Sequence, residues 1–182
     1  NAGDGAAAFI ISDEEIIAEQ AGSHTITENL MDTWRSAGDQ FVRSWEDRFA
    51  IEEGLERILA ETISGFFEKE GLSATDVAKI ALYSPDARRH SQVARQLGFQ
   101  SEQVQDSLFG RMGNTGAAFP LMLLVGALEE CRPDQLLLTV SYGDGSDVIG
   151  FRTTSNIGRP TSGLGVSGYL DSGLVLDSYE TY

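Results

Sequence analysis

The segment Gly113-Asn114-Thr115-Gly116-Ala117-Ala118 leads directly into an apolar run that ends at Leu128. The two glycines favour a tight loop, and the run predicts a buried helix over 119–128. Pro120 belongs to the first turn of this helix, where its missing N–H costs nothing. Asn114 then has two interpretations. Either it caps the helix, as Asn commonly does, or it presents its side-chain amide from a rigid elbow.

Helices and strands alternate on both sides of this loop. An amphipathic helix is predicted over 51–70, with a glycine stop at Gly71. A buried strand over 77–83 and a helix over 84–98 precede the loop, and an apolar strand over 135–142 follows it. The turn Gly143-Asp144-Gly145 and a strand over 147–152 complete a hairpin. This order predicts a layered α/β unit whose central strands are buried on both faces.

The two ends of the chain are predicted to be accessory to this unit. Residues 6–11 and 16–20 are expected to be two strands of a hairpin. Residues 21–50 are expected to be a long polar loop carrying both tryptophans, and such loops are usually functional or pack on a neighbour. Residues 153–182 are rich in Gly, Ser and Thr and are expected to be a linker or docking arm, with Gly168-Tyr169-Leu170 as its anchor.

Charge and hydropathy exclude several function classes. The 182 residues carry a net charge of −15, with no basic stripe, so neither nucleic acid nor an anionic membrane surface is expected as a partner. The longest apolar run, 117–128, is too short to span a bilayer. No secretory signal is recognised at the N-terminus, and we expect a cytoplasmic protein.

Cysteine and histidine offer little chemistry. Cys131 is the one cysteine of the chain and follows Glu129 and Glu130, whose charge disfavours a thiolate, so we interpret it as structural. His24 is expected to be solvated in the long loop, and His90 is expected on the surface of its helix. No Cys/His cluster has the spacing of metal ligands, so no metal is expected.

Several segments together resemble the second half of thiolase-fold condensing enzymes, especially hydroxymethylglutaryl-CoA synthases of the archaeal kind and ketoacyl-acyl-carrier-protein synthase III. They are the loop at 113–118, the strand and turn at 141–145, and the stretches 82–88 and 93–99. The likeness extends over 1–152 and implies a thiolase-like α/β fold, with helices packed on a mixed sheet. The resemblance also implies a division of the chain. Residues 1–20 are the last strands of the first thiolase half and residues 21–50 are a loop insertion. Residues 51–152 are the C-terminal thiolase-like half, and residues 153–182 are a linker or docking tail.

The resemblance also implies acyl-CoA chemistry. In such enzymes a cysteine of the first half takes the acyl group. A His and an Asn of the second half bind the thioester oxygen and stabilise the oxyanion as a carbon–carbon bond forms or breaks. Asn114 matches that Asn. The nucleophilic cysteine is then expected outside this chain, and CoA thioesters are expected as substrates, with no permanently bound cofactor.

The histidine of that pattern is replaced here. Its position at the end of the buried strand corresponds to Tyr83, and Pro85 and Arg88 fix the register. Tyrosine, with a pKa near 10, donates hydrogen bonds but is a poor general base at neutral pH. Two explanations stay open. Tyr83 keeps the donor role in a condensation or thiolytic cleavage that needs no histidine base, or the chain is a catalytically degenerate scaffold subunit of a thiolase-type complex.

The remaining residues that the resemblance implicates would contact coenzyme A or the acyl group. Arg88 matches a basic residue that carrier protein or CoA phosphates approach. Asp86 replaces a common Asn and adds negative charge where the pantetheine arm passes. The turn with Gly143 and Gly145 resembles a loop that borders the acyl pocket. The likeness further implies a homodimer or a larger complex that includes a small zinc- and OB-fold-domain protein.

Overall fold

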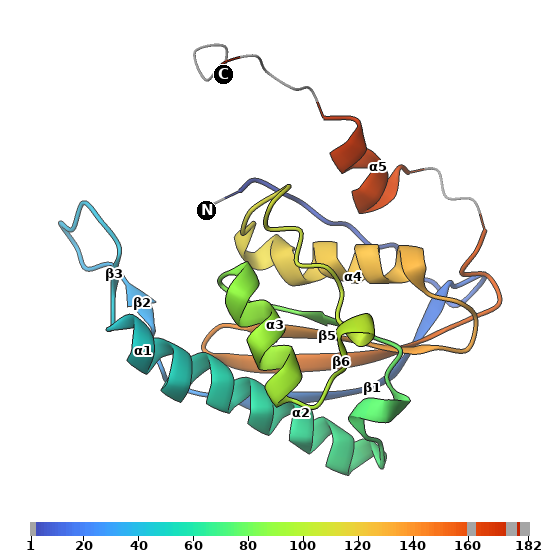
Figure 1. The fold of residues 1–182 in the computed structure, drawn as a ribbon, viewed down its shortest axis with the longest axis horizontal. Coiled ribbons are helices and arrows are strands. Elements are labelled where there is room, and N and C mark those ends of the chain that lie inside the picture. The colour runs from blue at the N-terminus through green and yellow to red at the C-terminus, as the bar shows by residue number, and fades with distance from the viewer. Residues whose placement is uncertain (1–2, 160–162, 174–177, 179–182) are drawn as a thin grey trace.

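The computed structural model describes residues 3–159, 163–173 and 178, and within them a mixed four-stranded sheet forms the centre of the fold (Figure 1). The strand order is β1-β6-β5-β4, which are Ala18–Thr27, Gly145–Thr153, Leu136–Tyr142 and Lys79–Leu82. β4 runs parallel to β5, whereas β6 is antiparallel to both β5 and β1. The predicted β5–β6 hairpin is therefore confirmed.

Helices cover both faces of this sheet (Figure 1). On one face lies α4 (Phe119–Glu130), which packs against Leu137 of β5. On the other face lie α2 (Arg57–Glu70) and α3 (Ala87–Gln96). The core on this side contains Leu59, Ile63, Phe66, Ile80, Leu82, Val93, Leu136, Leu138 and Val140. Because side chains of β5 alternate between the two cores, the strand is buried on both faces, as the sequence predicts.

Short helical turns connect these elements. α1 (Asp47–Phe49) and the π-helix η1 (Ala50–Glu56) run into α2, which ends at Gly71 with a φ of 67°. That left-handed conformation suits glycine, so the predicted glycine stop is confirmed. The 3₁₀ turns are η2 (Ala74–Asp76), η3 (Ser101–Gln103) and η4 (Gly116–Ala118).

The hairpin expected over 6–20 is wrong. Residues 6–11 form no strand, and Ile10 and Ile11 are almost fully exposed. The strand is β1 instead, which continues to Thr27 because it pairs with β6 along its length. β2 (Thr33–Trp34) and β3 (Arg43–Ser44) form a second, small sheet inside the stretch expected to be irregular. The division of the chain into thiolase halves, insertion and tail stays a prediction.

The segment after β6 contains a short helix, α5 (Gly165–Asp171), which lies against α4. The Glu129 carboxylate at the end of α4 accepts a hydrogen bond from the Val166 N–H at 2.6 Å and others from Ser167. Val166 is buried, whereas Tyr169 is 65% exposed. The anchor of this segment is therefore Val166 rather than the Gly168-Tyr169-Leu170 stretch.

Both histidines are placed differently from the expectation. His24 lies in β1 and packs so closely on α2 that a Cβ added at Gly65 would lie 2.4 Å from its Nε2. His90 is only 3% exposed and packs inward from α3. Helix periodicity places position 90 on the same side as Val93 and Ala94, which outweighs its polar neighbours in sequence. Among the described residues no helix is long and apolar enough to cross a membrane.

Candidate active site

Tyr83 and Asn114 meet where β4 ends and the loop before α4 begins. The Tyr83 N–H donates to the Val140 carbonyl at 2.9 Å, which extends the pairing with β5 one residue beyond β4. The Asn114 Nδ2 lies 3.5 Å from the Tyr83 hydroxyl oxygen, at the long end of a hydrogen bond. The structure thus brings together the two residues that the sequence singles out from separate segments.

The loop around Asn114 holds its amide in one orientation. Gly113 and Gly116 have φ values of 70° and 63°, which favour glycine at both positions. The Asn114 Oδ1 accepts the Gly116 N–H at 2.9 Å, so the NH₂ group of the amide faces Tyr83. Ala118 occupies the N-cap of α4, and no side chain caps that helix. Asn114 is therefore not the N-cap of α4, although its Oδ1 accepts the first N–H of the adjoining 3₁₀ turn η4, and its role as a site residue stays a prediction.

Tyr83 also lines a groove of about 280 Å³, which we call the tyrosine groove. Its wall contains Asp32, Thr33, Ser44, Trp45, Asp47, Ala50, Ile51, Leu55, Tyr83, Pro85, Arg89 and Tyr142. One side comes from the β2–β3 hairpin and η1, and the other from the ends of β4 and β5. Asn114 is not part of this wall. A ligand in this groove therefore contacts Tyr83 but not Asn114.

Tyr142 forms the floor beside Tyr83. The two rings stack with centroids 6.2 Å apart and planes 21° apart, and Phe119 packs edge-on against Tyr83. Burial raises the pKa of Tyr142 to about 12, and the negative charge of Asp32 adds to this effect. Tyr142 therefore stays protonated near neutral pH and acts only as a neutral hydroxyl.

The residues at the start of α3 have different environments. The Asp86 side chain caps α3 by accepting the Arg89 N–H at 2.9 Å, and it also pairs with the Arg89 guanidinium. Burial alone would raise the pKa of Asp86, but these interactions with Arg89 outweigh it and lower the pKa. Arg88 is exposed and does not line the tyrosine groove, whereas Arg89 does. Contact of Asp86 and Arg88 with coenzyme A stays a prediction.

The two glycines of the β5–β6 turn also differ. Gly145 has a φ of 127°, and a Cβ there would lie 2.0 Å from the Ile26 carbonyl oxygen, so glycine is required by the passage of β1. Gly143 is exposed, and nothing would meet a Cβ at that position within 4 Å. Neither glycine lines the tyrosine groove. Their role at an acyl pocket stays a prediction.

Cys131 is unsuited to be a nucleophile in this fold. It is half-buried at the end of α4, and burial raises the pKa of its thiol to about 11, with the Lys79 and Glu130 charges acting in opposite directions. Nearly all of it is therefore protonated at neutral pH. No group of three or more His, Cys, Asp or Glu side chains able to hold a metal ion occurs in the described parts of the chain.

Sequence reasoning did not identify Tyr142, Arg89 or Asp32 as site residues, although Tyr142 lies within a quoted motif and Arg89 directly follows one. Tyr142 precedes the Gly143 turn, and strand alternation puts it on the same side as Val140 and Leu138. Arg89 follows Arg88 directly, and only the helix phase separates the two. Asp32 lies in the stretch expected to be an irregular loop, and no local pattern indicates its approach to Tyr142.

Comparison with known families identifies the central part of the chain. Residues 67–151 match the family described as 3-oxoacyl-[acyl-carrier-protein] synthase III C-terminal. This range runs from the end of α2 to β6 and contains Tyr83, Asn114 and Tyr142.

Two curated relatives are hydroxymethylglutaryl-CoA synthases of archaea. That of Methanopyrus kandleri is 32% identical over 156 residues, which cover 84% of this chain and 44% of the relative. That of Methanocaldococcus jannaschii is 31% identical over 158 residues, which cover 85% of this chain and 46% of the relative. The chain therefore spans less than half the length of these relatives.

Solved structures share the fold. A hydroxymethylglutaryl-CoA synthase complexed with CoA superposes with a TM-score of 0.68 at 15% identity, over 85% of this chain and 44% of that one. The 3-oxoacyl-[acyl-carrier-protein] synthase III of Aquifex aeolicus gives a TM-score of 0.65 at 18% identity, over 78% and 46%. The expected thiolase-like α/β fold is thus confirmed. The chain belongs to the thiolase superfamily of condensing enzymes, and it corresponds to their C-terminal half.

Proposed function

We propose that this chain supplies the C-terminal half of the active site of an enzyme that forms or cleaves carbon–carbon bonds on CoA thioesters. The observation that carries this proposal is the contact of the Asn114 amide with the Tyr83 hydroxyl, 3.5 Å apart, at the ends of two neighbouring elements. The relatives named hydroxymethylglutaryl-CoA synthase and the solved synthase complexed with CoA support this substrate class.

In this proposal Asn114 and Tyr83 act as hydrogen-bond donors to the thioester carbonyl oxygen. Asn114 donates one N–H to the Tyr83 oxygen, which leaves the tyrosine O–H and the second amide N–H for the substrate. Negative charge develops on that oxygen as the α-carbon becomes a nucleophile, and preorganised donors stabilise it. The Oδ1 bond from Gly116 supports the role, because it fixes the direction of the NH₂ group.

The acyl-accepting thiol comes, in our proposal, from polypeptide outside this chain. Cys131 is excluded because of its raised pKa and its place at the far end of α4. The tyrosine groove would receive the part of the substrate that extends from Tyr83 away from Asn114, with Arg89 at its wall, and the exposed Arg88 would lie near the phosphates of coenzyme A. Assembly as a homodimer or with a zinc- and OB-fold-domain protein belongs to the same proposal.

The alternative of a degenerate scaffold subunit has no support among the relatives described above, which are all named as synthases. The two functions differ in one measurable step. An isotope-labelled acyl-CoA incubated with the full-length protein should leave a label on the protein that mass spectrometry detects. Absence of any acyl-enzyme would argue for the scaffold.

The donor role of Asn114 is tested by condensation rates of the full-length protein. Replacement of Asn114 by Ala should lower the rate by about 10²-fold or more, as loss of an oxyanion donor does. Asn29, which is exposed and away from the groove, gives the matched control Asn29→Ala, whose rate should be unchanged. A loss of less than about threefold in Asn114→Ala would refute the role.

A further inference from the structure

A short segment near the N-terminus, Gly3-Asp4-Gly5, lies across the loop that carries Asn114, and we call it the glycine strap. The Gly3 N–H donates to the backbone carbonyl oxygen of Asn114 at 2.9 Å. The N-terminal segment, dark blue in Figure 1, then continues beside α4, where Gly5 lies against Met122. The strap is therefore bound both to the loop and to the helix that follows it.

Both glycines of the strap are required by space. A Cβ at Gly3 would overlap the carbonyl oxygen of Met112, a backbone atom that cannot turn aside. A Cβ at Gly5 would lie 2.8 Å from the Cγ2 of Thr115 and 2.5 Å from the Sδ of Met122. Neither glycine has a φ in the left-handed range, so backbone conformation alone would allow other residues. The main chain of the strap therefore packs directly on the loop.

The strap completes the set of contacts that hold Asn114. Its side-chain Oδ1 accepts the Gly116 N–H at 2.9 Å, and its Nδ2 lies 3.5 Å from the Tyr83 hydroxyl oxygen. The bond from Gly3 holds the main chain of the same residue. Because the amide group moves with the main chain, a displaced loop would carry the Nδ2 away from a partner that is already at the long end of hydrogen-bond distance.

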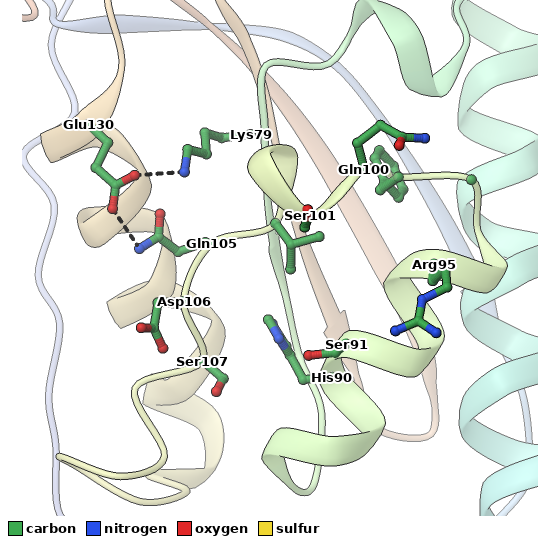
Figure 2. A pocket seen from close by; sticks show the side chains of 13 residues that line it. Lys79, His90, Ser91, Arg95, Gln100, Ser101, Gln105, Asp106, Ser107 and Glu130 are labelled. Atoms are coloured by element: carbon green, nitrogen blue, oxygen red, sulfur yellow. Dashed lines mark hydrogen bonds and ion pairs between the residues drawn. The ribbon is translucent and has the colours of Figure 1, made fainter.

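The helix after the loop is fixed at its other end. Glu130 pairs with the Lys79 Nζ of β4 at 2.6 Å and accepts a hydrogen bond from the Gln105 amide at 3.4 Å (Figure 2). Phe119 and Leu123 of α4 are fully buried in the core against the sheet. A methyl group added to the strap should therefore displace the loop rather than the whole helix.

We infer that the glycine strap positions Asn114 for condensation, an inference that rests on the proposed function. In that function the amide donates to an oxygen that becomes charged in the transition state. Displacing such a group by about 1 Å can cost about 10²-fold in rate. Gly3 and Gly5 are thus positioning residues, because they act through the loop and not on the substrate.

The first test compares acyl-enzyme formation and condensation in the full-length protein. In Gly3→Ala the acyl-enzyme should form as in the wild type. The kcat of condensation should fall by about tenfold or more, with the KM of the acceptor thioester changed by less than about threefold. Gly110→Ala is the matched control, since it lies just before the same loop, is exposed and has open space for a Cβ.

A merely structural defect would lower both steps together. The inference is therefore overturned if acylation and condensation fall equally in Gly3→Ala, or if its condensation rate stays within about threefold of the wild type. A loss in Gly110→Ala as large as that in Gly3→Ala would also overturn it.

The second test is a rescue at Gly5. In Gly5→Ala the new methyl presses on the Cγ2 of Thr115, the neighbour of Asn114, so condensation should fall by about tenfold. Thr115→Ser removes that Cγ2, and the flexible Met122 side chain can turn aside. The double variant should return to within about threefold of Thr115→Ser alone, and a double variant as slow as Gly5→Ala would refute the role of the strap.

A third test does not depend on activity. In the full-length protein with isotope-labelled asparagine, the side-chain amide signals of Asn114 are assigned by their disappearance in Asn114→Ala. They should shift in Gly3→Ala and keep their wild-type positions in Gly110→Ala, whereas unchanged signals in Gly3→Ala would overturn the inference. Shifted signals in a protein whose wild type forms no acyl-enzyme would instead refute the proposed function and leave the hold of the strap on Asn114 supported.

Discussion

The ring of Tyr83 stacks on the ring of Tyr142, with their centroids 6.2 Å apart, at the junction of β4 and β5. Two tyrosines thus occupy the end of the sheet where the related pattern has a histidine at position 83. Tyr83 contacts Asn114, whereas the hydroxyl of Tyr142 points toward η1, close to Gly54. The stack fixes the Tyr83 ring from one side, and Phe119 fixes it from another. The hydroxyl of Tyr83 is therefore held in place without a charged partner.

Replacement of Tyr83 by Phe should remove the hydroxyl and preserve the ring packing. We expect the condensation rate to fall by about 10- to 100-fold while the melting temperature stays nearly unchanged, because only a partly buried hydroxyl is lost. Rates and thermal unfolding of the full-length protein measure the two effects. Tyr83→His serves as the companion variant. It should give no gain, and a rate above that of the wild type would instead identify position 83 as a decayed catalytic site.

Gly54 in η1 should resist substitution by alanine. A Cβ there would lie 2.5 Å from the Tyr142 hydroxyl oxygen, and such overpacking costs about 1–3 kcal/mol. This exceeds the gain of roughly 0.5–1 kcal/mol that alanine normally brings to a helix. Urea unfolding should therefore show a less stable protein.

Its control is the double variant Gly54→Ala with Tyr142→Phe. Without the hydroxyl the nearest atom of Tyr142, Cζ, is 3.6 Å from the new methyl, and the remaining close neighbour, Leu30 Cδ2 at 2.9 Å, is the end of a flexible side chain that can turn aside. The double variant should recover stability relative to Gly54→Ala. Equal destabilisation in both backgrounds would show that Tyr142 is not the obstacle.

Replacement by alanine should destabilise the fold at Gly145 but not at Gly143. In Gly145→Ala the new methyl meets the Ile26 carbonyl oxygen of β1, a backbone atom that cannot turn aside, so we expect a loss of more than about 2 kcal/mol. Gly143→Ala has open space and should be within about 0.5 kcal/mol of wild type. Chemical denaturation of both variants checks this contrast, and similar losses in the two would contradict it.

The buried His90 should make stability depend on pH. Burial lowers the pKa of His90, although the Asp106 charge and the Leu82 backbone act the other way. At acidic pH the histidine is therefore protonated more readily in the unfolded chain than in the folded one. The free energy of unfolding falls as the pH drops below the histidine pKa of the unfolded chain, about 6.5. The free energy of unfolding, measured at about pH 7.5 and 5.5, should fall more for wild type than for His90→Gln.

An independent measurement follows the imidazole signals by NMR. The signal that disappears in His90→Gln should titrate with a midpoint below about 6.5. A midpoint above that value would mean that Asp106 outweighs burial.

The sequence predicts those parts of the fold whose signals are local. The apolar run of β5, the stop at Gly71 and the loop around Asn114 each carry their information within a few residues. β1 is different, because its mixed polar sequence becomes a strand only by pairing with β6 at the other end of the chain. The surface position expected for His90 from its charged neighbours is wrong, because the helix phase decides its burial.

The residues of the candidate site also fall into those that the sequence indicates and those that only the structure reveals. Tyr83 is indicated only by the resemblance to condensing enzymes, and Asn114 by its glycine-flanked loop together with that resemblance, and the structure places the two in contact. Asp32 and Trp45 reach the tyrosine groove through the small β2–β3 sheet, whose two-residue strands carry no periodic signal. Arg89 rather than Arg88 lines the groove because one residue turns a helical side chain by roughly 100°.

The carboxylate of Glu129 has a practical consequence for work on this protein. It accepts hydrogen bonds from the first turn of α5, and Val166 is buried beside it. A truncation placed between β6 and α5 would remove the N–H donors of the Glu129 carboxylate. It would also expose the surface of α4 that Val166 covers. Expression boundaries and fusion tags should therefore be placed after Asp171, where the final turn of α5 is already complete.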